Sequence, residues 1–120
     1  MSTPTELLTI ICQAIADKKG FNIVAIDVRG VSSLTEYFVI AEGSVNRHVL
    51  AEANHVMEQL KKWSIRPAHM EGLQEGDWVV LDYIDVIVHF FIPSLRSYYA
   101  LEEIWKEGAI VDVPISYQAV

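Results

Sequence analysis

Residues 77–91, DWVVLDYIDVIVHFF, determine the fold expected for this chain. Most of them are β-branched, aromatic or aliphatic, which favours two strands of a half-buried hairpin. If the turn is Ile84-Asp85, alternation along the strands separates two faces. One face is uniformly apolar and suits helix cover: Val79, Leu81, Tyr83, Val86, Val88 and Phe90. The other mixes apolar and polar side chains: Trp78, Val80, Asp82, Ile87, His89 and Phe91. The mixed face is typical of a recognition surface more than of a core.

Helices are expected on both sides of this hairpin in the sequence. The spacing Thr3-Pro4-Thr5-Glu6 is a capping box with proline at the first helical position, and the helix should reach about residue 18. Ser44 is expected to cap a second helix ending near residue 63, because its apolar residues keep helical spacing. A third helix is expected at 95–107, between Ser94 and Gly108.

Further strands are expected at 23–28, 37–41 and 68–71, each bounded by glycine, serine or proline. The predicted fold class is α/β, with a single mixed β-sheet of about five strands and three helices in the order α-β-β-α-β-β-β-α. Residues 1–108 are expected to form one domain. The tail, 109–120, is apolar without a clear period and is compatible with an edge strand, a segment docked on a partner, or disorder.

Composition limits the classes of function. The chain has 120 residues, 52% hydrophobic and 21% charged, which suits one packed domain. Its net charge of −7 argues against a basic surface that grips nucleic-acid phosphate, so no direct nucleic-acid readout is expected. An acidic domain is better suited to a basic protein partner. The apolar run 86–92 is too short to cross a bilayer, so no membrane association is expected.

The single cysteine and the histidines suggest no cofactor or metal. Cys12 lies on an apolar helical stripe, which predicts a buried, inert thiol. His48 and His55 are seven residues apart, about 10 Å along a helix, too far to chelate one ion. With no signal peptide visible, a cytoplasmic location is expected.

An enzyme is the alternative. Asp82 and Asp85 could hold a metal for nucleotidyl or phosphoryl transfer, with Gly43-Ser44 as a phosphate-facing turn at a helix N-terminus. The acid pair that such transferases place shortly after this turn is absent from residues 50–55, LAEANH. Aspartates beside a turn also commonly bond the backbone. The sequence therefore favours a protein that is not an enzyme.

Several motifs in order, between about residues 16 and 105, resemble the Iojap-related ribosomal silencing factors. They are IDV at 26–28, EYFVIAEGS at 36–44, Arg47, EG at 71–72, Trp78, LDY at 81–83, DVIVH at 85–89 and RSYYALEEIW at 96–105. The chain departs from that family's pattern at Glu36, Glu42, His48 and Ile84. Ile84 stands where glycine is usual, and a β-branched residue disfavours the positive φ of a tight turn.

The resemblance implies a nucleotidyltransferase-like fold without the transferase acids. It also implies a translation repressor that binds the large ribosomal subunit through ribosomal protein number fourteen and sterically blocks joining of the small subunit. We expect Trp78 to be the apolar anchor, with Val80, Ile87 and Phe91 widening the patch. Asp82 and Asp85 would pair with lysine or arginine of the partner, and His89 would hydrogen-bond at the centre. Self-association as a homodimer, through the tail or the same face, is a third possibility.

Overall fold

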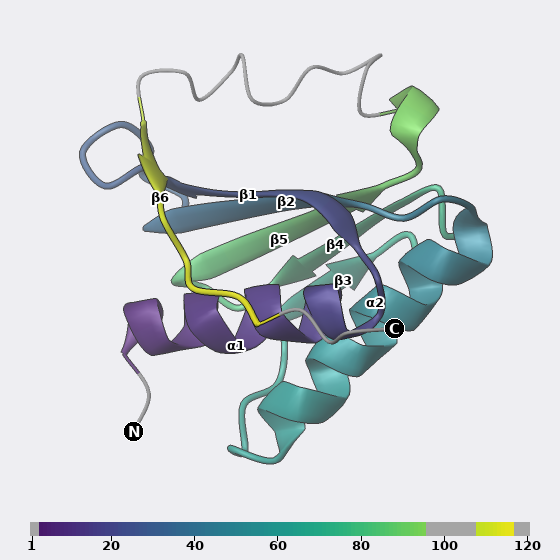
Figure 1. Ribbon diagram of the computed structural model, residues 1–120. Helices are drawn as coiled ribbons and strands as arrows, with labels where there is room; N and C mark the ends of the chain where they lie inside the picture. Colours follow the sequence, from purple (N-terminus) through teal and green to yellow (C-terminus); the bar gives the residue numbers. More distant parts are fainter. Residues whose placement is uncertain (1–2, 96–107, 117–120) are drawn as a thin grey trace.

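The computed structural model describes residues 3–95 and 108–116. In these residues one mixed sheet of six strands runs in the order β3-β4-β5-β2-β1-β6 (Figure 1). The helices are α1 (Pro4–Asp17) and α2 (Asn46–Lys61), and the strands are β1 (Phe21–Asp27), β2 (Tyr37–Glu42), β3 (His69–Glu71), β4 (Trp78–Asp82), β5 (Val86–Phe91) and β6 (Ala109–Val111). Neighbouring strands are antiparallel except β2 and β5, which are parallel. The predicted α/β fold class with one mixed sheet is confirmed.

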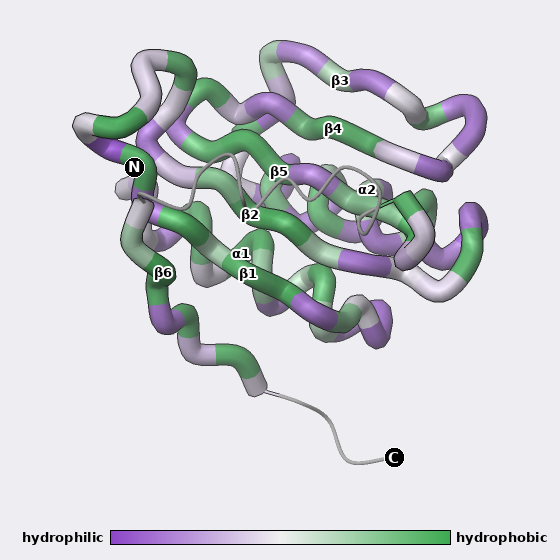
Figure 2. Tube along the Cα trace, turned by 90° about the horizontal axis from the view of Figure 1, so that it is seen from above, coloured by the Kyte–Doolittle hydropathy of each residue, from purple (hydrophilic) through white to green (hydrophobic). Residues whose placement is uncertain are grey.

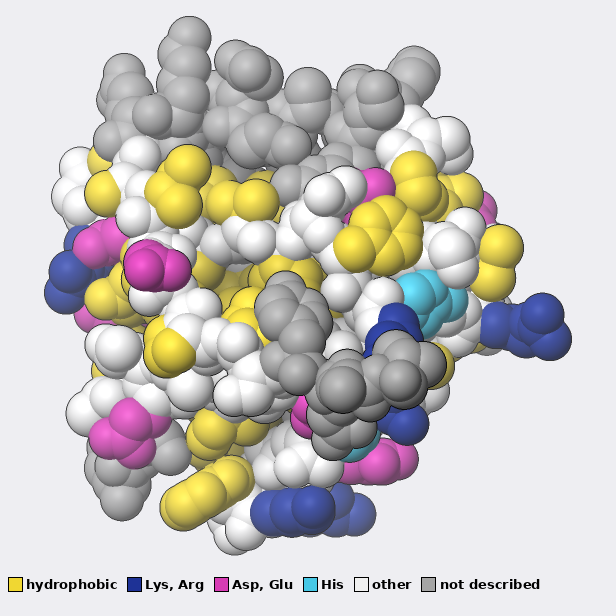
Figure 3. Space-filling view, in the orientation of Figure 1, with side chains coloured by type: hydrophobic (Ala, Val, Ile, Leu, Met, Phe, Trp, Pro, Cys, Tyr) yellow, Lys and Arg dark blue, Asp and Glu magenta, His cyan; other side chains and the backbone are white. Residues whose placement is uncertain are grey.

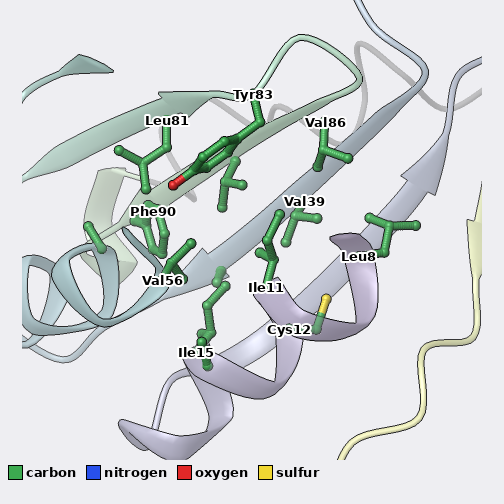
Figure 4. Close-up of a cluster of buried hydrophobic side chains, with 14 of the residues drawn as sticks. Leu8, Ile11, Cys12, Ile15, Val39, Val56, Leu81, Tyr83, Val86 and Phe90 are labelled. Carbon is green, nitrogen blue, oxygen red and sulfur yellow. The ribbon is translucent and has the colours of Figure 1, made fainter. Parts of the chain in front are cut away.

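Both α1 and α2 lie against the same face of the sheet (Figure 1). The main core fills the space between these helices and the sheet. There, Leu8, Ile11 and Ile15 of α1 pack with Val39, Leu81 and Phe90 of the sheet (Figure 4). Hydrophobic residues follow the inner strands and the sheet-facing sides of the helices (Figure 2). Cys12 is fully buried here, and burial raises the pKa of its thiol to about 12, so the predicted inert cysteine is confirmed.

The helix termini confirm one predicted cap and correct another. Thr3 caps α1, with its hydroxyl accepting the backbone N–H of Glu6 at 3.2 Å. Ser44 does not cap α2: the helix begins at Asn46, and Val45 at the cap position makes no side-chain hydrogen bond. Instead the Ser44 N–H donates to Nδ1 of His48 at 2.9 Å, because the imidazole reaches back over the turn.

Part of the tail belongs to the sheet. Residues 109–111 form β6, which pairs antiparallel with residues 25–27 of β1 at the sheet edge. The sheet therefore has a sixth strand in addition to the five expected. The apolar side chains of this segment that pack against the main core are Val111, Val113 and Ile115. Residues 93–95 are helical, and the rest of the predicted third helix lies outside the described residues.

The hairpin turn has the predicted two residues in an unusual geometry. Ile84 has a φ of 73°, and the Asp85 N–H donates to the Tyr83 carbonyl at 2.9 Å. A hydrogen bond across one residue with positive φ is a γ-turn of the rare, strained kind. The turn is held from outside by the Thr35 hydroxyl, which donates to the Ile84 carbonyl at 2.7 Å.

Candidate functional site

The register of β4 and β5 confirms the two predicted faces of the hairpin. Trp78 lies opposite Phe91, Val80 opposite His89, and Asp82 opposite Ile87. These six side chains point away from α1 and α2, whereas Val79, Leu81, Tyr83, Val86, Val88 and Phe90 lie in the helix-covered core. We call the first six residues the aromatic face.

An aromatic cluster forms the centre of this face. The Trp78 ring lies 5.2 Å from that of Phe91 and 6.2 Å from that of His89, and Phe38 of β2 lies 5.8 Å from His89, between ring centroids. The Trp78 indole N–H donates to Nδ1 of His89 at 3.2 Å. Burial lowers the pKa of His89 to about 4, so the ring is neutral and accepts this hydrogen bond at neutral pH. The indole is thereby held in a fixed orientation.

Burial divides the predicted contact residues into two groups. Phe91 is fully buried and His89 is 9% exposed, so neither presents a contact surface as the fold stands. His89 accepts the hydrogen bond of the indole and the Phe91 ring packs against it, so both position Trp78; their direct contact with a partner stays a prediction. Trp78, Val80 and Ile87 are partly exposed.

The two aspartates differ in what they do. Oδ1 of Asp82 accepts the Ile84 N–H at 2.8 Å and so stabilises the turn. The Asp85 side chain is exposed, whereas its backbone carbonyl accepts N–H groups from Glu36 and Tyr37. Asp85 is therefore the more exposed carboxylate. Replacing Asp82 by a cationic residue would remove the hydrogen bond to the turn as well as change the charge.

Sequence reasoning missed neighbours that only strand pairing brings to this face. β3 lies beside β4 with His69 opposite Asp82 and Glu71 opposite Val80, so both side chains extend the aromatic face toward the sheet edge. They are exposed and lie 3.5 Å apart at the closest nitrogen and oxygen. The alternation of the stretch 69–71 was visible in the sequence, but its register was not.

The turn end of the face carries a second group that the sequence did not indicate. Leu34 and Ile84 are 75% and 64% exposed and line a hollow of about 460 Å³ together with Arg29, Ser32 and Asp85. Exposed aliphatic side chains beside a free carboxylate suit a partner that offers both an apolar and a basic group.

The residues of the enzyme alternative do not meet. β2 and β5 run parallel, so Ser44 follows the far end of β2 while Asp82 and Asp85 lie at the start of β5. Six paired residues separate these ends, which corresponds to roughly 20 Å. Ser44 and the two aspartates therefore cannot form one transferase centre.

The Gly43-Ser44 turn is already in contact with other side chains of the protein. Nε2 of His48 contacts the Lys18 carbonyl at 2.6 Å, and the neighbouring Glu52 carboxyl is fully buried under Gly43. Burial, with the charge of Glu42 as the smaller cause, raises the pKa of Glu52 to about 9. The Ser44 N–H already donates to His48, so it is not free to bind a phosphate. Within residues 3–95 and 108–116, no three potential ligands form a metal-binding group, and no helix has the length and apolarity to span a bilayer.

The protein is thus a small domain with one mixed sheet, and the side of the sheet away from α1 and α2 carries the aromatic face.

Comparison with known proteins defines the family. The model of the family "Ribosomal silencing factor during starvation" matches residues 1–119. The ribosomal silencing factor RsfS of Zymomonas mobilis is 37% identical over 113 residues, covering 94% of this chain and 85% of that protein.

Two further relatives agree. A crystal structure of a Chromobacterium violaceum protein is 32% identical, with a TM-score of 0.85, and the match covers 99% of this chain and 95% of that one. Mouse "mitochondrial assembly of ribosomal large subunit protein 1" is 30% identical over 87 residues, which are 70% of this chain and 38% of that protein. The chain belongs to the family of ribosomal silencing factors. The resemblance to this family is confirmed, as is the prediction that the chain is not an enzyme.

Proposed function

We propose that this protein represses translation by binding the large ribosomal subunit through ribosomal protein number fourteen and blocking the joining of the small subunit by its bulk. Family membership supports a silencing role at the ribosome, and the mouse relative is named for large-subunit assembly. The observation that carries the proposal is the aromatic face, with a fixed indole at its centre and acids at its rim. The cytoplasm is the compartment in which we propose that it acts.

The mechanism needs no bond to be made or broken. The protein measures 36 × 35 × 29 Å, so a copy seated on the joining surface fills a gap that the small subunit must otherwise occupy. A protein that binds the free large subunit but not the joined ribosome shifts the joining equilibrium toward free subunits. The size of the shift depends on its affinity for the free large subunit. Silencing would then follow from occupancy alone.

Charge explains why an acidic protein suits this task. Glu71 lies opposite Val80, Asp82 ends β4, and Asp85 is exposed in the turn, so three carboxylates lie at the β3 side and the turn end of the face. Ribosomal proteins are commonly basic, so opposite charges would speed the encounter and orient it, while the indole would supply most of the affinity. Moderate salt should slow association more than it speeds release.

The experiment measures binding to purified large subunits by co-sedimentation and subunit joining by light scattering. We expect Trp78→Ala to weaken binding by at least about tenfold, because central aromatic anchors dominate such interfaces. Asp85→Lys tests the charge without touching the turn, and Asp82→Asn removes a charge while keeping an acceptor for the Ile84 N–H. Both should weaken binding, and all three should restore subunit joining.

Glu6→Lys, at an exposed residue in the first turn of α1, is the matched charge control and should bind normally. Thermal unfolding of each variant separates loss of the face from loss of the fold. Normal binding by the folded Trp78→Ala and Asp85→Lys variants would contradict the assigned face. Unimpaired subunit joining in an excess of the unmodified protein would contradict the function itself.

A further inference from the structure

A basic corner lies at the C-terminal end of α2. Lys61, Lys62 and Arg66 are all exposed there, three of the nine lysines and arginines in a chain of net charge −7. Among the residues that the structure describes, no carboxylate forms an ion pair with any of the three, whereas Arg29 is paired with Asp27 at 2.7 Å. Figure 3 shows lysine or arginine side chains beside hydrophobic ones at the foot of the molecule, where α2 ends in Figure 1.

The helix dipole accounts for only part of this cluster. A cation in the last helical turn is favoured by the negative end of the dipole, which explains Lys61. Arg66 lies five residues further on, beyond the reach of that effect. The corner is also locally rigid. The Ile65 and Trp63 N–H groups donate to the Leu60 carbonyl at 3.0 and 2.9 Å, and Ser64 takes a φ of 61° to close the turn.

An exposed indole stands among these cations. Trp63 is 63% exposed although it is one of the largest apolar side chains in the protein. Lys61 and Arg66 also line a hollow of about 280 Å³, together with Met57, Ile65, Pro67 and Met70. A flat aromatic ring flanked by unpaired cations is the combination that proteins use to stack a base while holding the adjoining phosphates.

We infer that this basic corner contacts RNA: Lys61, Lys62 and Arg66 bind its phosphates, and one of its bases stacks on Trp63. The inference rests on the proposed function, because a large ribosomal subunit offers RNA beside its basic proteins. β3 is the boundary between the two surfaces: Met70 lines the hollow of the basic corner, whereas His69 and Glu71 lie on the aromatic face. One docked copy can therefore present an acidic face to protein and a basic corner to adjacent RNA.

The probe is a fluorescein-labelled, single-stranded 15-nucleotide oligoadenylate, titrated with the full chain and followed by anisotropy at several salt concentrations. Each phosphate contact with a single strand contributes about −0.7 to the slope of log affinity against log salt. We expect Lys61→Gln/Lys62→Gln to reduce the slope by about 1.4 and to weaken binding at least about tenfold at low salt. Trp63→Ala should weaken binding by about tenfold with the slope unchanged, because stacking releases no counterions.

Lys18→Gln/Lys19→Gln is the matched control, since this lysine pair also follows a helix C-terminus and carries the same charge. It should leave the slope and the affinity unchanged. Equal effects of the two pairs, or no measurable binding, would overturn the inference. Tighter binding of a labelled oligoglutamate of equal charge would assign the corner to an acidic peptide instead. Because the probe is free RNA, its result is separable from failure of the subunit-joining assay.

Discussion

At the scale of single residues, Ile84 shows where local preference and tertiary structure conflict. A β-branched residue disfavours positive φ, yet Ile84 has a φ of 73°. Three contacts hold it there: the Asp82 carboxylate on its N–H, the Thr35 hydroxyl on its carbonyl, and the hydrogen bond of the γ-turn. The strain was predictable from the sequence, but one of the contacts that impose it, that of Thr35, comes from a loop 49 residues away.

Ile84→Gly should relieve this strain. A non-glycine residue in such a region costs of order 1–3 kcal/mol, and glycine gives back part of the gain through its larger entropy when unfolded. We expect the free energy of unfolding to rise by about 1 kcal/mol, measured by urea titration. Val31→Gly, at an exposed apolar residue of the neighbouring loop with ordinary φ, is the control and should not stabilise. A lower stability of Ile84→Gly would show that the turn is not strained.

Glu52 makes stability depend on pH. Its pKa is raised from 4.5 to about 9 in the folded protein, chiefly by burial, so the native state keeps a proton that the unfolded chain releases. Between about pH 4.5 and 6.5 the lowered pKa of His89 has an opposite effect of similar size, because the unfolded chain binds a proton there that the native imidazole does not. Stability should therefore fall as pH rises from about 6.5 to 9, with a loss of order 3 kcal/mol by pH 9. Glu52→Gln, which does not titrate, should flatten this dependence in urea titrations across that range. The control, Glu58→Gln on the exposed side of α2, should keep the pH dependence of the unmodified protein. If the free energy of unfolding of Glu52→Gln changed with pH as steeply as that of the unmodified protein, Glu52 would not be its cause.

At the scale of elements, β6 and the segment after it close one edge of the sheet. β6 pairs with β1, and Gln13 of α1 then clamps Ser116 through two hydrogen bonds of 2.8 Å, one to its N–H and one to its carbonyl. Two apolar residues between these points, Val113 and Ile115, pack on the main core. Among the described residues of the tail, 109–111 are a strand and 112–116 run beside α1, which is why the sequence showed no single period there.

Gln13→Ala should loosen this segment without unfolding the domain. Losing two exposed hydrogen bonds costs about 1 kcal/mol locally. We expect the Ser116 amide to exchange with solvent roughly five times faster, measured by hydrogen exchange, with smaller changes in β6 and none in β4. Gln59→Ala on α2 serves as the control. Unchanged protection of Ser116 would mean that the apolar contacts hold the segment by themselves.

At the scale of the whole molecule, charge is distributed in a way that the net value conceals. A total of −7 predicted an acidic protein without a basic surface. The fold instead gathers carboxylates around the aromatic face and leaves three unpaired cations at the end of α2, with β3 between them. Lys61 and Lys62 are visible in the sequence as a charged pair, but that they form no ion pair with a described carboxylate is a property of the folded chain.

Two separate surfaces should act additively on one large subunit. Combining Asp85→Lys with Lys61→Gln/Lys62→Gln should weaken binding by about the product of the separate effects, because distant sites without shared partners add in free energy. Co-sedimentation of the three proteins with large subunits measures this. Lys18→Gln/Lys19→Gln combined with Asp85→Lys should behave like Asp85→Lys alone. A combined effect no larger than the stronger single one would indicate a single surface.

The hairpin 77–91, its two faces, the capped first helix and the inert cysteine followed from the sequence, because alternation, capping and burial of apolar residues act over short distances. The motifs along the chain also led to the right family. Four features depended on tertiary structure: the burial of His89 and Phe91, the addition of His69 and Glu71 to the face, the distance between Ser44 and the aspartates, and the basic corner. Each depends on strand register or on contacts between residues far apart in the chain, and no local pattern encodes those.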